Sequence, residues 1–249
     1  MYNYSLVDIA PTIARLIKVP LPKTDGTVIT EVLDYAKNSN NVILIIIDSF
    51  DYCTYKRLKE YLPNIKKIEK NGLLIFLKSV SEHTTPAIAS IFCGYYPDFH
   101  KIYETGDVFN SNIKSILEIA SNFGIKSAII IESKGALAMK PKIDVAIGVD
   151  TIKDIMNYDN QIKKFTIKVL KEHSPKIIAT HFRAIDRYAH ENRTWNDIIY
   201  AAKNIDKHIG DILNCINNAI VMICGDHTIH WKKKTVAEKY VPLIIGKKI

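Results

Sequence analysis

The sequence predicts a single α/β domain with a mostly parallel central sheet and helices on both faces of that sheet. Two apolar runs, at residues 42–47 and 219–224, have no polar interruption, which is typical of strands buried on both faces. Segments with helical periodicity alternate with these and other strand-like runs. The 249 residues, of which 47% are hydrophobic and 24% charged, suffice for one large core. We therefore expect residues 1–249 to form one domain.

The first third of the chain is expected to supply two strands and several helices. Residues 5–19 place Ile9, Ile13 and Leu16 on one face of a helix, and Asp8 suits its N-cap. The elements expected next are a short helix at 30–36, the strand at 42–47, helical segments at 55–61 and 65–70, and a strand at 73–78.

The rest of the chain continues this alternation of helices and strands. Pro86 suits the first position of a helix, because that position needs no backbone N–H. Gly124 is placed to end an amphipathic helix over 113–123. The later elements are expected to be strands at 127–131 and 145–149, a helix at 162–172, a strand at 176–180, a long helix with apolar positions from 198 to 209, and strands at 219–224 and 241–245.

The net charge of +8 and the pI near 9.1 favour anionic partners, either phosphate esters or nucleic acid. The charge does not choose between them. The lysines are scattered and are not interleaved with aromatic residues, so a solvated surface is the better interpretation for most of them, and nucleic acid is disfavoured against a small phosphorylated substrate. No apolar run approaches membrane-spanning length, and we expect no membrane partner. The sequence does not indicate an oligomeric state.

Cysteine usage and the amino terminus both predict a cytoplasmic protein. Cys53, Cys93, Cys215 and Cys224 lack CxxC spacing and lie in apolar settings, which predicts core residues and not a zinc knuckle or disulfides. The amino terminus lacks the basic and apolar regions of a signal peptide.

Acidic residues follow three of the predicted strands, at Asp48, Asp186 and Asp226. The carboxyl ends of parallel strands lie along one edge of a sheet, so these carboxylates can meet there. An aspartate alone also ends strands by making a turn, but histidines accompany two of the three. His227 follows Asp226, and His190 stands four residues after Asp186, on the same face if the segment is helical. A surface ion pair is the alternative interpretation of Asp186 and His190.

A nucleophile and a third imidazole complete the candidate site. Thr84 and Thr85 precede Pro86, and hence a helix amino terminus that favours an anion. A threonine hydroxyl is inert at its free pKa, so it needs a neighbouring base or metal ion, and a plain N-cap is the alternative. His230 belongs to the same stretch as Asp226, although a single histidine is more often a polar surface group.

Together these residues resemble the alkaline phosphatase superfamily, which includes nucleotide pyrophosphatase-type phosphodiesterases, cofactor-independent phosphoglycerate mutases and sulfatases. The resemblance covers most of the chain and rests on four motifs, which are the strand end at Asp48, the segment HTTPAIASIFCGYYPDFH, the D-x-x-x-H spacing and the GDH triplet. It implies an alkaline phosphatase-like core without a cap domain, because the chain is too short for the large inserted domain of the mutases.

The resemblance also implies two divalent metal ions, with zinc as the commonest choice and manganese or iron compatible with the same ligands. The implied ligands form two sets, which are Asp186, His190 and His230 for one ion, and Asp48, Asp226, His227 and the oxygen of the nucleophile Thr84 for the other. Two features depart from the family pattern. Lys101 and Thr228 stand where the family usually has glycine, and His230 lies closer to GDH than the family's last histidine.

The order of two segments also differs from the family. There, a VPLI strand commonly leads into a segment like SLVDIAPTIARLIKVPLP, whereas here VPLII lies near residue 245 and the second segment begins at residue 5. We hypothesise that the chain is circularly permuted, with residues 5–36 equivalent to the family's C-terminal segment.

The resemblance implies hydrolysis of phosphate mono- or diesters through a phospho-threonine at Thr84. Position 84 lacks the cysteine that sulfatases convert to formylglycine, so phosphate esters are favoured, with phosphonate or sulfate esters as alternatives. Lys101, Asn110 and Arg183 are candidates for contact with a phosphate oxygen. The rival class is a non-catalytic protein that keeps the fold and binds a phosphate ligand or nucleic acid.

Overall fold

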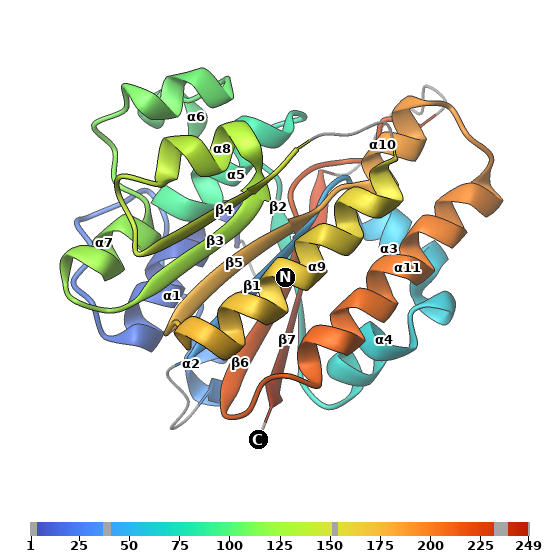
Figure 1. Cartoon of the computed structure of the whole chain (residues 1–249), viewed down its shortest axis with the longest axis horizontal. Coiled ribbons are helices and arrows are strands. Elements are labelled where there is room, and N and C mark those ends of the chain that lie inside the picture. The colour runs from blue at the N-terminus through green and yellow to red at the C-terminus, as the bar shows by residue number, and fades with distance from the viewer. Residues whose placement is uncertain (1–3, 37–40, 151–153, 232–238, 249) are drawn as a thin grey trace.

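β1 (Val42–Ile47) lies near the middle of the sheet in the computed structural model, which describes residues 4–36, 41–150, 154–231 and 239–248 (Figure 1). β5 (Ile177–Phe182) and β6 (Ala219–Gly225) flank it, and both run parallel to it. Every residue of these three strands is buried. Because Ile47 pairs with both Phe182 and Gly225, the residues that follow the three strands emerge side by side at one edge.

Within the described residues, the sheet has seven strands in the order β2-β7-β6-β1-β5-β3-β4. The remaining strands are β2 (Leu73–Lys78), β3 (Ser127–Glu132), β4 (Val145–Val149) and β7 (Tyr240–Lys248). β7 runs antiparallel to β2 and to β6, and the other pairs are parallel. The prediction of a mostly parallel sheet is therefore confirmed.

Helices cover both faces of the sheet, because successive strand residues point to opposite sides (Figure 1). Leu44 and Ile46 face one apolar cluster, and Ile43 and Ile45 face the other. The first cluster is covered by η1 (Leu6–Asp8), α1 (Ile9–Ile17), α2 (Thr30–Ala36), α5 (Thr84–Cys93), α7 (Ile116–Asn122) and α8 (Ser133–Met139). The second is covered by α3 (Tyr52–Leu58), α4 (Pro63–Lys70), α9 (Ile155–His173), α10 (Ala184–His190) and α11 (Trp195–Leu213).

The described parts of the connections contain the short helices η2 (Lys59–Tyr61), α6 (Pro97–His100) and η3 (Thr105–Phe109). In the part of the chain that the structure describes, no helix combines the length and the apolar character needed to cross a membrane.

Several helices begin where a polar side chain caps them, and not where the apolar periodicity begins. α9 starts at Ile155, earlier than predicted, because the Asp154 carboxylate accepts hydrogen bonds from the first turn. α7 starts at Ile116, later than predicted, because Ser115 and Glu118 form a capping box. α8 was not predicted, and the Glu132 side chain caps it.

Three local predictions from the sequence are wrong. Pro86 is the third residue of α5 and not the first, because the helix already begins at Thr84. Cys53 is exposed and Cys215 is half-buried, whereas Cys93 and Cys224 are buried as predicted. The polar neighbours of Cys53 on α3 explain its position, since Lys56 and Arg57 share that short surface helix.

The Asp8 side chain links two parts of the amino-terminal segment by hydrogen bonds and does not cap α1. Its carboxylate accepts hydrogen bonds from the backbone N–H groups of Ser5 and Thr27, each at 2.6 Å. Ser5 in turn forms a parallel bridge with Lys78 of β2. A Cβ atom at Gly26 would lie 2.0 Å from the carbonyl oxygen of Val7, so only glycine permits this close approach.

Candidate functional site

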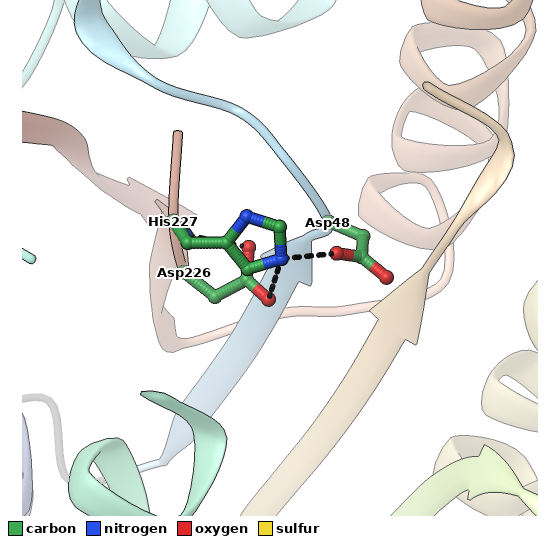
Figure 2. A group of neighbouring side chains, drawn as sticks. All are labelled: Asp48, Asp226 and His227. Carbon is green, nitrogen blue, oxygen red and sulfur yellow. Dashed lines mark hydrogen bonds and ion pairs between the residues drawn. The ribbon is translucent and has the colours of Figure 1, made fainter. Parts of the chain in front are cut away.

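Three acidic or basic groups converge at the carboxyl edge of the sheet, where β1 and β6 end. Asp48 follows β1, and Asp226 and His227 follow β6. The His227 Nε2 atom lies 3.1 Å from Asp48 Oδ1 and 3.7 Å from Asp226 Oδ2 (Figure 2). One ligand atom from each residue lies within 4.8 Å of the others, and all three side chains are buried. This group, Asp48, Asp226 and His227, is called the inner cluster below.

Gly225 allows the two strand ends to approach each other this closely. A Cβ atom at this position would lie 2.0 Å from the carbonyl oxygen of Phe50, in the loop that follows β1. A backbone atom cannot move aside as a flexible side chain can. Steric contact therefore explains why the GDH triplet has glycine at this position. The Ser49 N–H then donates to Asp226 Oδ1 across the same gap, at 3.0 Å.

Thr84, the predicted nucleophile, points its hydroxyl into the inner cluster. Its Oγ1 atom donates to Asp48 Oδ1 at 3.3 Å and lies 3.1 Å from His227 Nε2. Thr84 is the first residue of α5, and His83 occupies the N-cap without a capping side-chain bond. The Thr84 hydroxyl therefore does not serve as an N-cap. The next residue, Thr85, lies in the wall of a cavity.

The other three predicted ligands lie next to the inner cluster but are less closely gathered. His190 Nε2 lies 3.3 Å from Asp186 Oδ1, and both residues belong to α10, one turn apart. The His230 ring centroid is 5.7 Å from that of His190 and 5.4 Å from that of His227. His230 Nε2 lies 2.7 Å from the carbonyl oxygen of Glu82, and the His190 and His230 residues are exposed.

Ser49 connects the two groups, and the sequence reasoning did not identify it. Its Oγ atom donates to Asp186 Oδ1 at 2.7 Å, while its N–H donates to Asp226. Its φ of 59° is uncommon for a residue other than glycine, and such conformations cluster at functional sites. The only signal in the sequence is its place directly after Asp48, which is too general to single it out.

His181 and Arg183 extend the site along β5 on the other side of Asp48. The distances to Asp48 Oδ2 are 3.6 Å from His181 Nε2 and 3.5 Å from Arg183 Nε. Lys101 and Asn110, the other candidates for phosphate contact, are exposed and do not line the cavity beside Thr84. Of these three predicted candidates, Arg183 alone lies at the site.

The charges of the inner cluster compensate one another. Burial opposes ionisation of Asp48, but its hydrogen bond with His227 and the nearby basic groups keep the pKa of Asp48 well below its usual range. Burial and the charge of Asp48 raise the pKa of Asp226 well above its usual range. Burial opposes protonation of His227, yet the two carboxylates raise its pKa to about 10. Bound protons thus neutralise the negative charge of the two buried carboxylates. A divalent cation can supply the same positive charge in their place.

The inner cluster fits a divalent cation by geometry and by chemistry. Asp48 Oδ2 and Asp226 Oδ2 are buried and have no hydrogen-bond partner among the described residues. Buried carboxylate oxygens normally have hydrogen-bond partners, whereas the nearest basic groups lie 3.5 to 3.7 Å from these two oxygens, so both oxygens keep the capacity to bind a cation. Oxygen and imidazole ligands together suit zinc, manganese or iron. Next to such an ion the Thr84 hydroxyl can ionise, which makes nucleophilic chemistry available.

Comparisons with known proteins bear on this arrangement. A sequence model of the sulfatase family matches residues 40–245. A comparison with curated protein sequences found no match. Among solved structures, phosphonoacetate hydrolase from Sinorhizobium meliloti 1021, in complex with phosphonoformate, is 15% identical with a TM-score of 0.60. The alignment covers 76% of this chain and 57% of that one, so this chain spans little more than half of its length.

Two further structures share the fold over more of the chain. The lipoteichoic acid synthase LtaP from Listeria monocytogenes is 12% identical with a TM-score of 0.61, covering 96% of this chain and 71% of that one. The C-terminal periplasmic domain of EcEptC from Escherichia coli, in complex with Zn, is 13% identical with a TM-score of 0.58, covering 86% and 74%. At these identities the likeness establishes the fold.

Proposed function

The chain belongs to the sulfatase family, within the alkaline phosphatase superfamily, and from this premise we propose that it is a metal-dependent hydrolase of phosphate esters. The observation that carries the proposal is the Thr84 hydroxyl, directed into a buried cluster that suits a divalent cation. A fold alone does not imply an activity, but a nucleophile and its activating groups in contact do support one.

Two sets of residues would hold two divalent ions. Asp48, Asp226 and His227 would hold the first beside Thr84, and the second set is Asp186, His190 and His230. A bound ion supplies the positive charge that ionises the Thr84 hydroxyl and neutralises the phosphate oxygens. Zinc is the ion we expect, with manganese or iron as alternatives.

Thr84 would carry the phosphoryl group between two displacement steps. In the first step the Oγ1–P bond forms as the ester P–O bond breaks, and the alcohol leaves with a proton. In the second step water forms a new P–O bond, the Oγ1–P bond breaks, and Thr84 regains its proton. The amino-terminal N–H groups of α5 and the Arg183 guanidinium would bind the phosphate oxygens, since α5 begins at Thr84 and Arg183 lines the same cavity.

Phosphate esters are preferred to sulfate esters because Thr84 stands where a sulfatase needs a cysteine for its formylglycine. The rival, a binding protein without catalysis, gives no reason for the Thr84 hydroxyl to be directed at Asp48 and His227.

The test compares turnover by the protein loaded with zinc or manganese on aryl phosphate, bis-aryl phosphate, aryl phosphonate and aryl sulfate. We expect phosphate ester hydrolysis to exceed sulfate ester hydrolysis. Thr84→Ala should lower kcat by roughly 10³-fold or more while metal content, measured by elemental analysis, stays near that of the parent.

Thr85→Ala is the matched control, because it removes a neighbouring hydroxyl that does not contact the inner cluster. It should keep most of the activity. Equal turnover by Thr84→Ala and the parent protein would refute the assignment of the nucleophile. Absence of turnover on every ester, with metal bound, would favour the binding protein.

A further inference from the structure

A cavity of about 550 Å³ opens beside the nucleophile and suggests what kind of alcohol the substrate carries. Thr84, His181 and Arg183 belong to its lining, so the cavity is continuous with the site described above. The volume lies within the range of pockets that bind small molecules. α5, β3 and α8 contribute lining residues, as does the segment 102–118.

Away from Thr84, the wall of the cavity is largely apolar. α5 contributes Ile88 and Phe92, β3 contributes Ile129 and Ile131, and α8 contributes Met139. Removing an apolar group from water against such a wall gains about 0.8 kcal/mol for each methylene. The wall therefore favours a ligand with an apolar part of some length.

The polar residues of the wall near α7 are already engaged with one another. The Glu118 carboxylate accepts a hydrogen bond from the Ser115 N–H at 2.7 Å and lies 3.7 Å from Lys142 Nζ. The Ser115 hydroxyl accepts one from the Glu118 N–H, and Lys142 Nζ donates to the Val108 carbonyl at 2.9 Å. These groups form the α7 cap and its ion pair.

The Glu132 carboxylate, on the wall next to α8, is likewise engaged. The two Glu132 carboxylate oxygens accept hydrogen bonds from the N–H groups of Gly135 and Lys134, which cap α8. The Ser111 hydroxyl accepts one from the Ile113 N–H. A sugar or nucleobase entering the cavity would find few uncommitted polar groups on these two walls, and each of its own polar groups left without a partner would cost about 1–3 kcal/mol.

We infer that the site acts on phosphate esters of apolar alcohols, with the alkyl or aryl group of the alcohol bound in this cavity and the phosphate at Thr84. The inference rests on the proposed function, which it deepens by naming the substrate class. It is carried by the presence of Thr84 in the cavity wall, by the apolar residues of that wall, and by the use of Ser115, Glu118 and Glu132 in helix caps.

Straight-chain alkyl phosphates from ethyl to octyl test this inference, because their leaving alcohols have nearly the same pKa. With the zinc-loaded protein, kcat/KM should rise by up to about fourfold for each added methylene until the cavity is filled. Propyl phosphate should exceed glycerol phosphate, which has the same carbon skeleton with two hydroxyl groups, by about tenfold or more. A flat series, or a preference for glycerol phosphate, would overturn the inference.

A binding series separates this inference from the proposed function. Affinities of ethyl- to octylphosphonate for the zinc-loaded Thr84→Ala protein, measured by calorimetry, need no turnover. They should rise with chain length, and a flat series would overturn the inference. If ethyl phosphate is hydrolysed and both series are flat, the apolar substrate class fails while the hydrolase function stands. If no ester is hydrolysed but the affinities rise, the cavity is assigned correctly and the hydrolase function fails.

Two variants narrow the cavity, and one serves as their control. Ala89→Phe adds a ring on the α5 wall, and Gly135→Leu adds a side chain on the α8 wall, where a Cβ atom meets nothing closer than 3.4 Å. Each should reduce the octyl-to-ethyl ratio at least tenfold. Leu137→Phe, on the exposed side of α8, should leave the ratio and the turnover of ethyl phosphate unchanged. A ratio that survives in a folded Ala89→Phe or Gly135→Leu protein would overturn the inference.

Discussion

Asp48 is the residue on which the contacts of the site converge. Thr84 and His227 contact one of its carboxylate oxygens, and His181 and Arg183 lie beside the other. This follows from its place at the end of β1, a central strand, because the flanking strands bring their own following residues to it from both sides.

The first prediction at this scale concerns Gly225, which permits the approach of β6 to the loop after β1. Gly225→Ala should destabilise the protein by about 1–3 kcal/mol or more, because its Cβ would collide with the Phe50 carbonyl. It should also weaken metal binding, since Asp226 and His227 follow directly. Urea unfolding and zinc titration would measure the two effects.

Gly106→Ala is the control for this prediction, because only the end of the Lys134 side chain lies within 4 Å of its added Cβ, at 3.9 Å. It should change the free energy of unfolding by less than about 0.5 kcal/mol. A Gly225→Ala protein as stable as Gly106→Ala would contradict the steric argument.

At the residue scale, the sequence identified side chains whose chemistry is unusual for their position. Asp48, Asp226 and His227 were recognisable because charged groups at the ends of buried strands demand an explanation. Ser49 was not recognised as part of the site, because a serine in a loop is common, and a structural role was favoured for His181, although it adjoins the predicted site in the sequence. Their roles depend on contacts with residues far along the chain, which local patterns do not reveal.

At the scale of single elements, α11 carries a buried histidine that makes stability depend on pH. The His208 ring stacks on Phe182 at 6.0 Å, and its Nε2 atom lies 2.9 Å from Asn204 Nδ2. Burial, aided by the charge of Lys163, lowers the pKa of His208 to about 4. The native protein therefore keeps this ring neutral at pH values where an unfolded chain protonates it.

The second prediction follows from the sign of this shift. An unfolded histidine has a pKa near 6.5, so between about pH 6.5 and pH 4 the unfolded state gains a proton that the native state refuses. Stability should fall as the pH is lowered through this range, by at most about 3 kcal/mol from His208. His208→Phe keeps an aromatic ring against Phe182 and should remove this part of the slope.

Urea unfolding of the parent protein and of His208→Phe, at several pH values between 4.5 and 7, would measure the difference in slope. His173→Gln removes an exposed histidine at the end of α9 and should keep the parent's slope. Parallel curves for His208→Phe and the parent would show that this histidine does not contribute.

The bounds of an element were predicted well where burial of an apolar run sets them, and poorly where a capping side chain sets them. β1, β2 and β4 have the bounds expected from their apolar runs. α3, α7 and α9 begin at residues set by Asp51, Ser115 and Asp154, whose side chains accept backbone hydrogen bonds. A sequence contains many polar residues that could act as an N-cap. An apolar periodic pattern therefore predicts the presence of a helix more reliably than it predicts the residues at which the helix ends.

At the scale of the whole molecule, the segment 5–36 is attached to the core that the family match covers. The match spans residues 40–245, and α1 and α2 precede it. α1 nevertheless buries Ile9 and Ile13 completely, and Ser5 joins the edge strand β2. The circular permutation hypothesised from the order of segments stays a prediction, and this packing is compatible with it.

The third prediction tests whether the position of this segment in the chain matters. A rearranged protein with residues 5–36 placed after Lys248 should fold with a Tm and a zinc content close to the parent's. Ser5 lies beside Lys78, at the end of β2 that pairs with Tyr240, so the linker must return along the nine residues of β7, roughly 30 Å. About 15 glycine and serine residues suffice for that span.

A protein that lacks residues 5–36 is the control, and it should lose stability because α1 leaves an apolar face of the sheet uncovered. Thermal unfolding followed by circular dichroism distinguishes the three chains. If the rearranged protein is as unstable as the truncated one, the connection to residue 41 is essential and the permutation hypothesis loses its physical basis.

The bond from Ser49 to Asp226 joins residues 177 positions apart in the sequence. Contacts of such separation close large loops and form late and slowly when a chain folds. The inner cluster therefore cannot exist in any partly folded state that lacks the pairing of β1 with β6. A refolding chain would therefore hold an ion tightly at this cluster only after β1 has paired with β6.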